Sequence, residues 1–351
     1  MLRKRGYTLL VLLVFVATVV LSAKEGRQDL PGPSGLQLPK GWPKPKNIFK
    51  KNPWTPAGYF LGKRLFFDNH LSLDSSISCA GCHQPFAAFA NYDHDLSHGV
   101  GNSLTNRNAP GLFNLAWSHE LHWDGAINHL EVQPLSPLTA KNEMGETLEH
   151  VLYKLRRDSI YPALFKAAFG DTVVNSQRML KAIAQFTGTL VSANSKYDRV
   201  MNGKDSFQPY EAAGYQVFKR NCAACHKEPL FTDHSFRNNG LALNRFKDIG
   251  RMKVTSQPDD SLKFKVPSLR NVQFTFPYFH DGSAYSLYQV VDHYLKGIQK
   301  DQKTLDPILK NGISMTEREK NELVLFLYTL SDSSFIRNPE YNVPLPVLAP
   351  H

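Results

Sequence analysis

Apolar residues recur at helical intervals in several segments of this 351-residue chain. Between residues 176 and 193, the side chains of Leu180, Ile183, Ala184 and Leu190 fall on one face of a predicted helix. The same kind of spacing predicts helices that begin at Pro56 and break at Asp68-Asn69, and helices at about 146–157, 160–169 and 209–221.

Two capping boxes mark further helix starts. Ser286-x-x-Gln289 begins a helix predicted to end at Gly297, and Thr316-x-x-Glu319 begins a last helix that runs to about Leu330. Glycine and proline punctuate the remaining segments, which predicts loops and short helices there. The expected fold class is therefore mainly α, with long loops and little β structure.

The first 54 residues differ in pattern from the rest. Arg3-Lys4-Arg5 precedes an apolar run from about Thr8 to Ser22, which is shorter than the ~20 residues of a membrane-spanning helix. This pattern predicts a secretory signal over residues 1–23, or an N-terminal membrane anchor if the signal is retained. Prolines recur through residues 24–54, which are predicted to form an extended linker.

All four cysteines belong to two C-x-x-C-H motifs. In such a motif two thiols add across the vinyl groups of a c-type haem, and the histidine becomes the proximal iron ligand. A zinc ribbon would place its two pairs only about 15–20 residues apart, and a redox dithiol needs no following histidine. The chain is thus predicted to carry two covalently bound haem c groups on Cys79, Cys82 and His83, and on Cys222, Cys225 and His226.

Two cytochrome c-like domains follow from the two motifs. An Ala-Gly-Tyr triplet precedes each motif, and a polar stretch from Asn194 to Phe207 separates them. The predicted division is an N-terminal haem domain over 55–204, a C-terminal haem domain over 205–335, and a tail over 336–351.

The formal net charge is +10, which suits an acidic electron-transfer partner. No basic run or basic–aromatic interleaving indicates a nucleic-acid partner. Covalent haem attachment is normally completed outside the bacterial cytoplasm. Together with the signal pattern, this predicts a periplasmic protein.

From about Leu61 to Leu330 the chain resembles the bacterial dihaem cytochrome c peroxidase family, including its MauG branch. Beyond the haem motifs, the resemblance rests on several ordered segments: Leu-Phe-Phe-Asp at 65–68, Arg-Asn-Ala-Pro at 107–110, Trp-Asp-Gly at 123–125, Glu-Met-Gly at 143–145, Val-Pro-Ser-Leu-Arg-Asn at 266–271 and Pro-Tyr-Phe-His-Asp-Gly at 277–282.

The resemblance implies that the N-terminal haem, with His83 as proximal ligand, reacts with hydrogen peroxide and that the C-terminal haem relays electrons. Glu143 matches the family's distal acid–base residue, with Gln133 beside it. Trp123 matches the tryptophan between the haems. On sequence alone, a solvated glutamate and a core tryptophan are the ordinary alternatives.

Two positions depart from typical family peroxidases. Val100 stands where many members have a histidine that caps the peroxidatic iron, which implies an open site; a different loop register would make His98 the cap. Tyr294 stands in place of the methionine ligand of the second haem, as in the MauG branch. His293 is a competing ligand, and a buried core tyrosine is the structural alternative because Tyr294 continues an apolar helix face.

Two further points concern partners and metals. MauG passes electrons through a surface tryptophan near its second haem motif, and that position is Arg220 here. The family also has a calcium ion between the haems, which by resemblance would be bound by Asn108 and the carbonyl oxygens of Thr275 and Pro277.

The expected function is reduction of hydrogen peroxide to water with electrons from a small periplasmic donor, a cytochrome c or a cupredoxin, or from an organic substrate. One alternative is MauG-like oxidation of side chains in a partner protein. A third hypothesis is a non-enzymatic electron carrier. Family members are often homodimers, so the resemblance also implies a homodimer.

Overall fold

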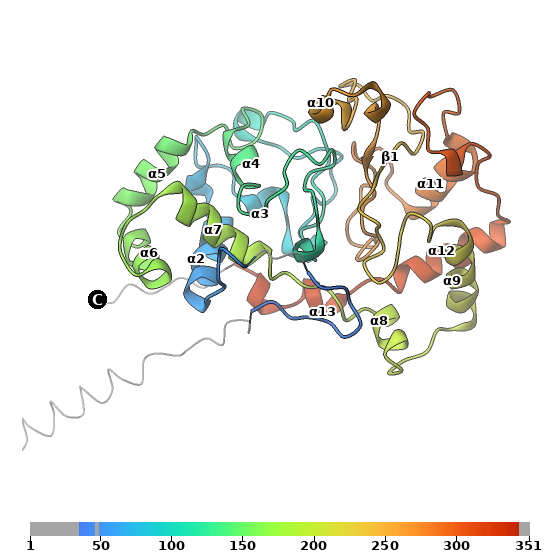
Figure 1. The fold of residues 1–351 in the computed structure, drawn as a ribbon, viewed down its shortest axis with the longest axis horizontal. Helices are drawn as coiled ribbons and strands as arrows, with labels where there is room; N and C mark the ends of the chain where they lie inside the picture. The colour runs from blue at the N-terminus through green and yellow to red at the C-terminus, as the bar shows by residue number, and fades with distance from the viewer. Residues whose placement is uncertain (1–34, 46–48, 344–351) are drawn as a thin grey trace, which may run out of the picture. The chain divides into compact units, whose positions relative to one another are not determined.

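The computed structural model describes residues 35–45 and 49–343, and most of its regular structure is helical (Figure 1). The α-helices are α2 Pro56–Phe67, α3 Cys79–Cys82, α4 Leu135–Thr139, α5 Leu148–Arg157, α6 Tyr161–Phe169, α7 Ser176–Thr187, α8 Lys196–Met201, α9 Pro209–Asn221, α10 Met252–Thr255, α11 Leu287–Asp292, α12 Glu317–Tyr328 and α13 Ser333–Ile336. A π-helix follows α11 at His293–Gly297.

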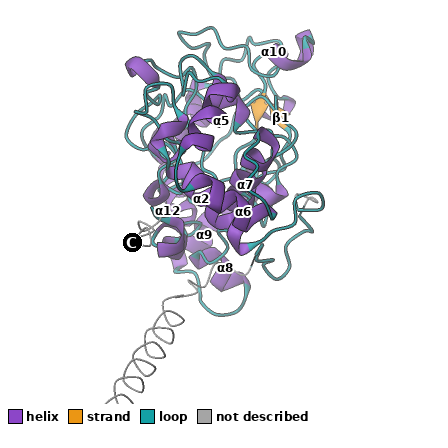
Figure 2. Ribbon diagram, turned by 90° about the vertical axis from the view of Figure 1, so that its left-hand side faces the viewer, coloured by secondary structure: helices purple, strands orange, loops and turns teal. Residues whose placement is uncertain are grey.

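Two short strands form the only named sheet in the described part of the chain. Strands β1 (Phe236–Arg237) and β2 (Phe264–Lys265) pair antiparallel, with Phe236 opposite Lys265 (Figure 2). The backbone N–H of Lys265 also donates a hydrogen bond to the carbonyl oxygen of Trp123 at 2.7 Å, which ties the loop that carries Trp123 to the sheet. The predicted mainly α fold with little β structure is confirmed.

The first haem motif lies beside a core built by α2, α5, α6 and α7. The side chain of Thr55 caps α2 by accepting a hydrogen bond from the backbone N–H of Gly58. Helix α2 crosses α7 at Gly62, where an added Cβ atom would lie 1.8 Å from the carbonyl oxygen of Ala182. The missing side chain allows this close approach, and Cys79 packs at the edge of the resulting core.

The second haem motif follows α9, which packs against α12. At Gly214 an added Cβ would lie 1.9 Å from the carbonyl oxygen of Glu322. On either side of this contact Phe218 and Phe326 are fully buried, and Cys222 packs against the same core. The crossing of α9 and α12 therefore positions the second motif.

Gly214→Ala is expected to lower the free energy of unfolding by about 1–3 kcal/mol, because the extra methyl group overpacks this crossing. Denaturant unfolding of the haem-loaded protein measures the effect. Gln216→Ala, at an exposed position of the same helix, is the matched control and should leave the midpoint nearly unchanged. Equal stability of the Gly214 variant and the wild type would contradict the close-approach explanation.

Most predicted helices are present, and their ends show what the sequence pattern missed. Helix α7 ends at Thr187 and not at 193. Its apolar pattern continued because Leu190 is buried in a neighbouring core with Phe66 and Phe186, beyond the end of the helix. Both predicted capping boxes are present, at Ser286 and Thr316.

The described parts of the proline-rich segment and of the tail pack against the fold. The ring of Trp42 lies 5.0 Å from that of Trp117, edge to face, and Tyr341 joins a core cluster with Phe89. The predicted signal or anchor at 1–23 lies outside the described residues, as do 24–34, 46–48 and 344–351 of the linker and tail. No helix within 35–45 and 49–343 is long and apolar enough to span a membrane. The proposed domain boundaries stay a prediction.

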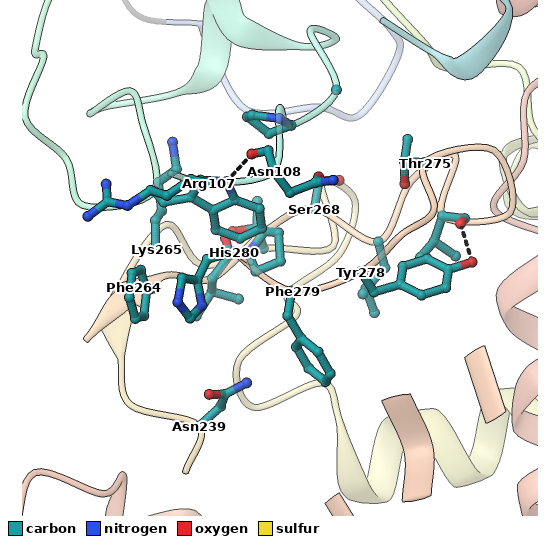
Figure 3. Close-up of a pocket in the computed structure, with 18 of the residues that line it drawn as sticks. Arg107, Asn108, Asn239, Phe264, Lys265, Ser268, Thr275, Tyr278, Phe279 and His280 are labelled. Carbon is teal, nitrogen blue, oxygen red and sulfur yellow. Dashed lines mark hydrogen bonds between the residues drawn. The ribbon is translucent and has the colours of Figure 1, made fainter. Parts of the chain in front are cut away.

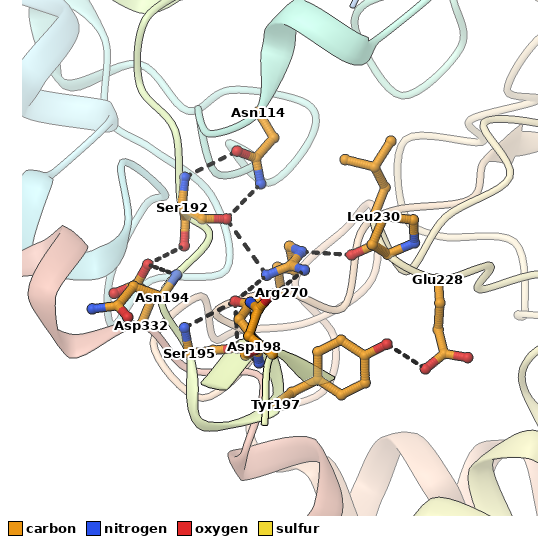
Figure 4. A network of polar contacts seen from close by, with 12 residues as sticks. Asn114, Ser192, Asn194, Ser195, Tyr197, Asp198, Glu228, Leu230, Arg270 and Asp332 are labelled. Carbon is orange, nitrogen blue, oxygen red and sulfur yellow. Dashed lines mark hydrogen bonds and ion pairs between the residues drawn. The ribbon is translucent and has the colours of Figure 1, made fainter. Parts of the chain in front are cut away.

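A buried polar network holds the segment between α7 and α8 in place (Figure 4). The guanidinium of Arg270, which has no exposed surface, donates hydrogen bonds of 2.7 and 2.8 Å to the Asp198 carboxylate. Its Nε donates to the carbonyl oxygen of Pro229 at 2.7 Å. The amide of Asn271 donates to the hydroxyl of Ser192 at 2.9 Å. The chain between α7 and α8 is thus held by side chains far along the sequence.

Candidate active site

A cavity of about 660 Å³ joins the two C-x-x-C-H motifs. Its wall includes Cys82 and His83 from the first motif and Cys222, Cys225 and His226 from the second. The cavity is also lined by the other predicted site residues: Trp123, Gln133, Glu143, Tyr294, Asn108, Thr275 and Pro277. Cys79 is not among the lining residues and packs against the first core. Figure 3 shows the part of the wall around Asn108 and Thr275.

Both motif histidines are oriented by backbone carbonyl groups. Nδ1 of His83 lies 2.8 Å from the carbonyl oxygen of Phe89, and Nδ1 of His226 lies 3.1 Å from that of Phe231. A carbonyl oxygen only accepts, so each Nδ1 carries the proton and each Nε2 keeps its lone pair. Burial also lowers the pKa of both imidazoles, which favours the neutral form that ligates iron.

The four cysteines are unpaired thiols in the structure. Burial raises the pKa of Cys79 and of Cys222 to about 12, so both thiols are neutral. A thioether is also neutral, and these half-buried positions therefore suit covalent haem attachment better than a thiolate metal site. The unpaired thiols, the oriented histidines and the shared cavity all fit two haem c groups.

Glu143 lies at the first motif's end of the cavity. Burial raises the pKa of its carboxyl, and its charge is close enough to act on the thiol of Cys82. The carbonyl oxygen of Glu143 accepts a hydrogen bond of 2.8 Å from the backbone N–H of Val100. Gln133 lines the same cavity. The structure thus brings together the predicted acid–base residue, its neighbour and the first haem motif.

His98 lies outside the cavity. Its ring is exposed, and its Nδ1 lies 2.6 Å from the side-chain oxygen of Asn102. Val100 does not line the cavity either, and its side chain would contact a Cβ atom added at Gly145. Among the described residues, neither of these two side chains lines the cavity.

Trp123 is held by its backbone carbonyl oxygen, which accepts a hydrogen bond from the backbone N–H of Lys265, and by its indole. The indole N–H donates a hydrogen bond of 2.9 Å to the carbonyl oxygen of Asn108 (Figure 3). Trp123 lines the same cavity as both motifs. Its role between the two haems stays a prediction.

Tyr294 and His293 are adjacent in the π-helix but have different surroundings. Tyr294 lines the cavity, and burial raises its pKa to about 12 although its hydroxyl forms a hydrogen bond with the side chain of Asn239. Nε2 of His293 instead donates a hydrogen bond of 3.0 Å to the carbonyl oxygen of Asn239, and His293 does not line the cavity. The π-helix, a feature common at functional sites, therefore presents the tyrosine.

Asn108 is buried, and its amide donates a hydrogen bond of 3.1 Å to the carbonyl oxygen of Asp95. That arrangement leaves its side-chain oxygen available for a cation. Arg220, at the position of the MauG surface tryptophan, forms an ion pair of 2.7 Å with Glu319.

Comparison with known proteins places these features in a family. The model of the di-haem cytochrome c peroxidases matches residues 56–206. MauG, the methylamine utilization protein of Methylorubrum extorquens, is 37% identical over 318 residues, which cover 88% of this chain and 87% of that protein. The chain belongs to the dihaem cytochrome c peroxidase family. Its similarity to MauG places it in the MauG-like branch, as the resemblance predicted.

Two other relatives of this dihaem peroxidase agree with the assignment. The cytochrome c551 peroxidase of Nitrosomonas europaea is 33% identical and covers 81% of the chain, and 82% of that protein is matched. A crystal structure of a MauG-like protein associated with microbial copper homeostasis has a TM-score of 0.81 and 31% identity, covering 88% of this chain and 98% of that one. The protein is a peroxidase-like oxidoreductase with two haem c groups, and none of these relatives supports a plain electron carrier.

The structure of this family member also shows site residues that sequence reasoning missed. The Arg107 guanidinium donates to the carboxylates of Asp124 (2.6 Å) and Asp248 (2.6 and 2.9 Å). The ring of His280 stacks on Phe264 at 3.7 Å, and burial lowers its pKa to about 4. Arg107, Asp124 and His280 belong to quoted motifs, so they could have been proposed. No local pattern indicated Asp248 or Phe264.

Proposed function

We propose that this dihaem peroxidase works in the periplasm and reduces hydrogen peroxide to water at an open N-terminal haem pocket. Its electrons come from a small donor protein, a cytochrome c or a cupredoxin. The observation that carries this proposal is the position of Glu143, whose half-buried carboxyl shares one cavity with Cys82 and His83 while His98 lies outside it. Peroxide therefore meets an acid–base group and no capping side chain.

In this proposal Glu143 moves the proton that peroxide cleavage requires. Its side-chain oxygen takes a proton from the inner peroxide oxygen and returns it to the outer one, which leaves as water. A general acid–base group works best when its pKa is near the working pH, and the raised pKa of Glu143 moves in that direction. Gln133 orients the peroxide by hydrogen bonding. When bound, the haem iron supplies the redox centre at which peroxide accepts electrons.

Tyr294 is proposed as the distal ligand of the second haem, and Trp123 as the relay between the haems. An anionic tyrosinate would stabilise the ferric state, whereas methionine raises the reduction potential. The hydrogen bond from Nε2 of His293 to the carbonyl oxygen of Asn239 supports the choice of Tyr294. A calcium ion held by Asn108 with the carbonyl groups of Thr275 and Pro277 belongs to the same proposal.

Tyr294→Met is expected to raise the reduction potential of one haem by a measurable part of the roughly 0.8 V range that axial ligands set. Spectroelectrochemical titration measures both potentials. His293→Gln is the neighbouring control, and it should leave both potentials unchanged because His293 bonds to the backbone outside the cavity. A shift in the His293 variant, with none in the Tyr294 variant, would reverse the ligand assignment.

A second candidate function is MauG-like oxidation of side chains in a partner protein. It is favoured by the position of Tyr294 in the cavity and by the likeness to MauG and to the MauG-like protein associated with copper homeostasis. Arg220, paired with Glu319, replaces the tryptophan through which MauG passes electrons, so any such partner would use a different route.

Peroxide turnover with a chemically defined donor separates the two candidates. The purified protein is mixed with hydrogen peroxide and a reduced small cytochrome c or cupredoxin. The peroxidase proposal expects two donor molecules oxidised per peroxide, with no change of mass in the donor polypeptide. Absence of donor oxidation, together with a stable mass increase in a co-purified protein, would favour the second candidate.

A further inference from the structure

Within residues 35–45 and 49–343, Lys265 differs from the other basic side chains of the cavity wall in having no carboxylate partner. Four cationic side chains line the cavity: Arg107, Arg237, Lys253 and Lys265. The first three form ion pairs of 3.0 Å or less with carboxylates: Arg107 with Asp124 and Asp248, Arg237 with Asp233 and Asp306, and Lys253 with Asp248.

Nζ of Lys265 instead donates a hydrogen bond of 2.7 Å to the backbone carbonyl oxygen of Glu120. The carboxylate of Glu120 is paired with Arg251 at 3.0 Å, and that of Asp124 with Arg107 at 2.6 Å. Within the described residues, Lys265 thus has a backbone acceptor but no ion-pair partner. An ammonium group has three donors, so two of them remain for a ligand.

The surroundings of Lys265 make an unpaired charge costly. Burial lowers its pKa to about 8, and the more distant charges of Glu120 and Asp124 offset this only in part. A buried cation is normally neutralised by a counter-ion, because its transfer out of water is otherwise unfavourable. Lys265 is half-buried in the cavity wall, so a negatively charged group of a bound ligand would be favoured beside it.

His122 supplies a second polar nitrogen of the cavity wall, close enough to Lys265 for the lysine charge to act on its ring. Its Nε2 is buried without a hydrogen-bond partner in the described structure, and its ring lines the cavity. The carbonyl oxygen of the next residue, Trp123, accepts the 2.7 Å hydrogen bond from the backbone N–H of Lys265, so the two segments run side by side. The backbone of His122 has φ = 65°, a conformation that costs energy in a non-glycine residue.

We propose that Lys265 and His122 form the binding site for a carboxylate group of a bound haem, and that Lys265 sets the reduction potential of that haem next to Trp123. Haem c keeps two propionate carboxylates after its vinyl groups have reacted with cysteine. One of them supplies a negative charge and accepts from both nitrogen atoms. Lys265 is a positioning residue in this arrangement. The inference rests on haem attachment, and it is independent of the donor or substrate.

Lys265→Met, in the protein with both haems attached, removes the positive charge while keeping an unbranched apolar side chain. The carboxylate is then left without a counter-ion and favours the ferric state. Spectroelectrochemical titration should show the reduction potential of one haem shifted downward and that of the other unchanged. Lys265→Arg, which keeps the charge, should restore the potential toward the wild-type value.

Lys253→Met is the matched control, since it deletes a lysine of the same cavity wall that already pairs with Asp248. It should change either potential much less than Lys265→Met does. Unchanged potentials in the Lys265→Met protein, or an equal shift in the Lys253→Met protein, would overturn the proposal. The readout does not involve peroxide, so failure of the peroxidase proposal would leave this result interpretable.

Discussion

Glu143→Gln is expected to lower the rate of reaction with hydrogen peroxide by about 10²–10⁴-fold, because glutamine cannot take and return the proton that O–O cleavage requires. Stopped-flow absorbance in the haem region measures this rate directly. The wild-type rate should also fall as the pH is lowered through the pKa of Glu143, since the carboxylate form accepts the first proton. Burial raises that pKa, so this acid limb should lie above the ordinary range of a glutamate.

The control for this experiment is Glu149→Gln, an exposed glutamate at the start of α5. It should react with peroxide at the wild-type rate. Both variants should keep the absorbance spectrum of two attached haems, which separates loss of chemistry from loss of cofactor. A Glu143→Gln protein that reacts with peroxide as fast as the wild type would show that another group moves the proton.

Arg270→Met is expected to lower the free energy of unfolding by about 3–5 kcal/mol, the usual cost of breaking a buried ion pair from one side. The substitution leaves the Asp198 carboxylate buried without its bidentate partner. It also removes the cation that lies 4.5 Å from the ring of Trp42. Denaturant unfolding of the haem-loaded protein measures the change in free energy.

A surface ion pair provides the control for the buried pair of Arg270 and Asp198. Arg199 and Asp205 interact at 3.1 Å at the surface, so Arg199→Met should cost less than about 1 kcal/mol. Burial alone would raise the pKa of Asp198, but Arg270 and Ser195 outweigh it and lower that pKa. The stabilisation is therefore present above the unfolded-state pKa of about 4 and is lost as the pH falls further. Similar costs for both arginine variants would mean that the buried network contributes little.

The sequence predicted most helices of this fold because capping residues and prolines near the helix ends mark where they begin. The Ser286 and Thr316 capping boxes and the proline at the start of α9 each act within one helical turn. The exception is instructive, since Leu190 satisfied the helical pattern of α7 but is buried in a different core. Periodicity shows that a residue is buried and leaves open which neighbours bury it.

The residues of the cofactor site also fall into those that a local sequence pattern predicts and those that it does not. The C-x-x-C-H motifs give their chemistry within five residues, so the haem groups could be predicted. The ion pair of Arg107 with Asp248 spans 141 positions, and the missing partner of Lys265 becomes visible only when every charge in the cavity wall is placed. Contacts of this kind depend on how loops pack, which no local pattern records.

The central claim is that an open peroxidatic haem pocket with its own acid–base group makes this protein react directly with peroxide. The most direct test mixes the fully oxidised protein with hydrogen peroxide in a stopped-flow spectrometer and repeats the experiment after reduction of one haem. The account predicts an immediate spectral change in the fully oxidised protein, followed by a persistent oxidised spectrum. A protein that stays inert until one haem is reduced would contradict it, because a side chain would then cap the first haem.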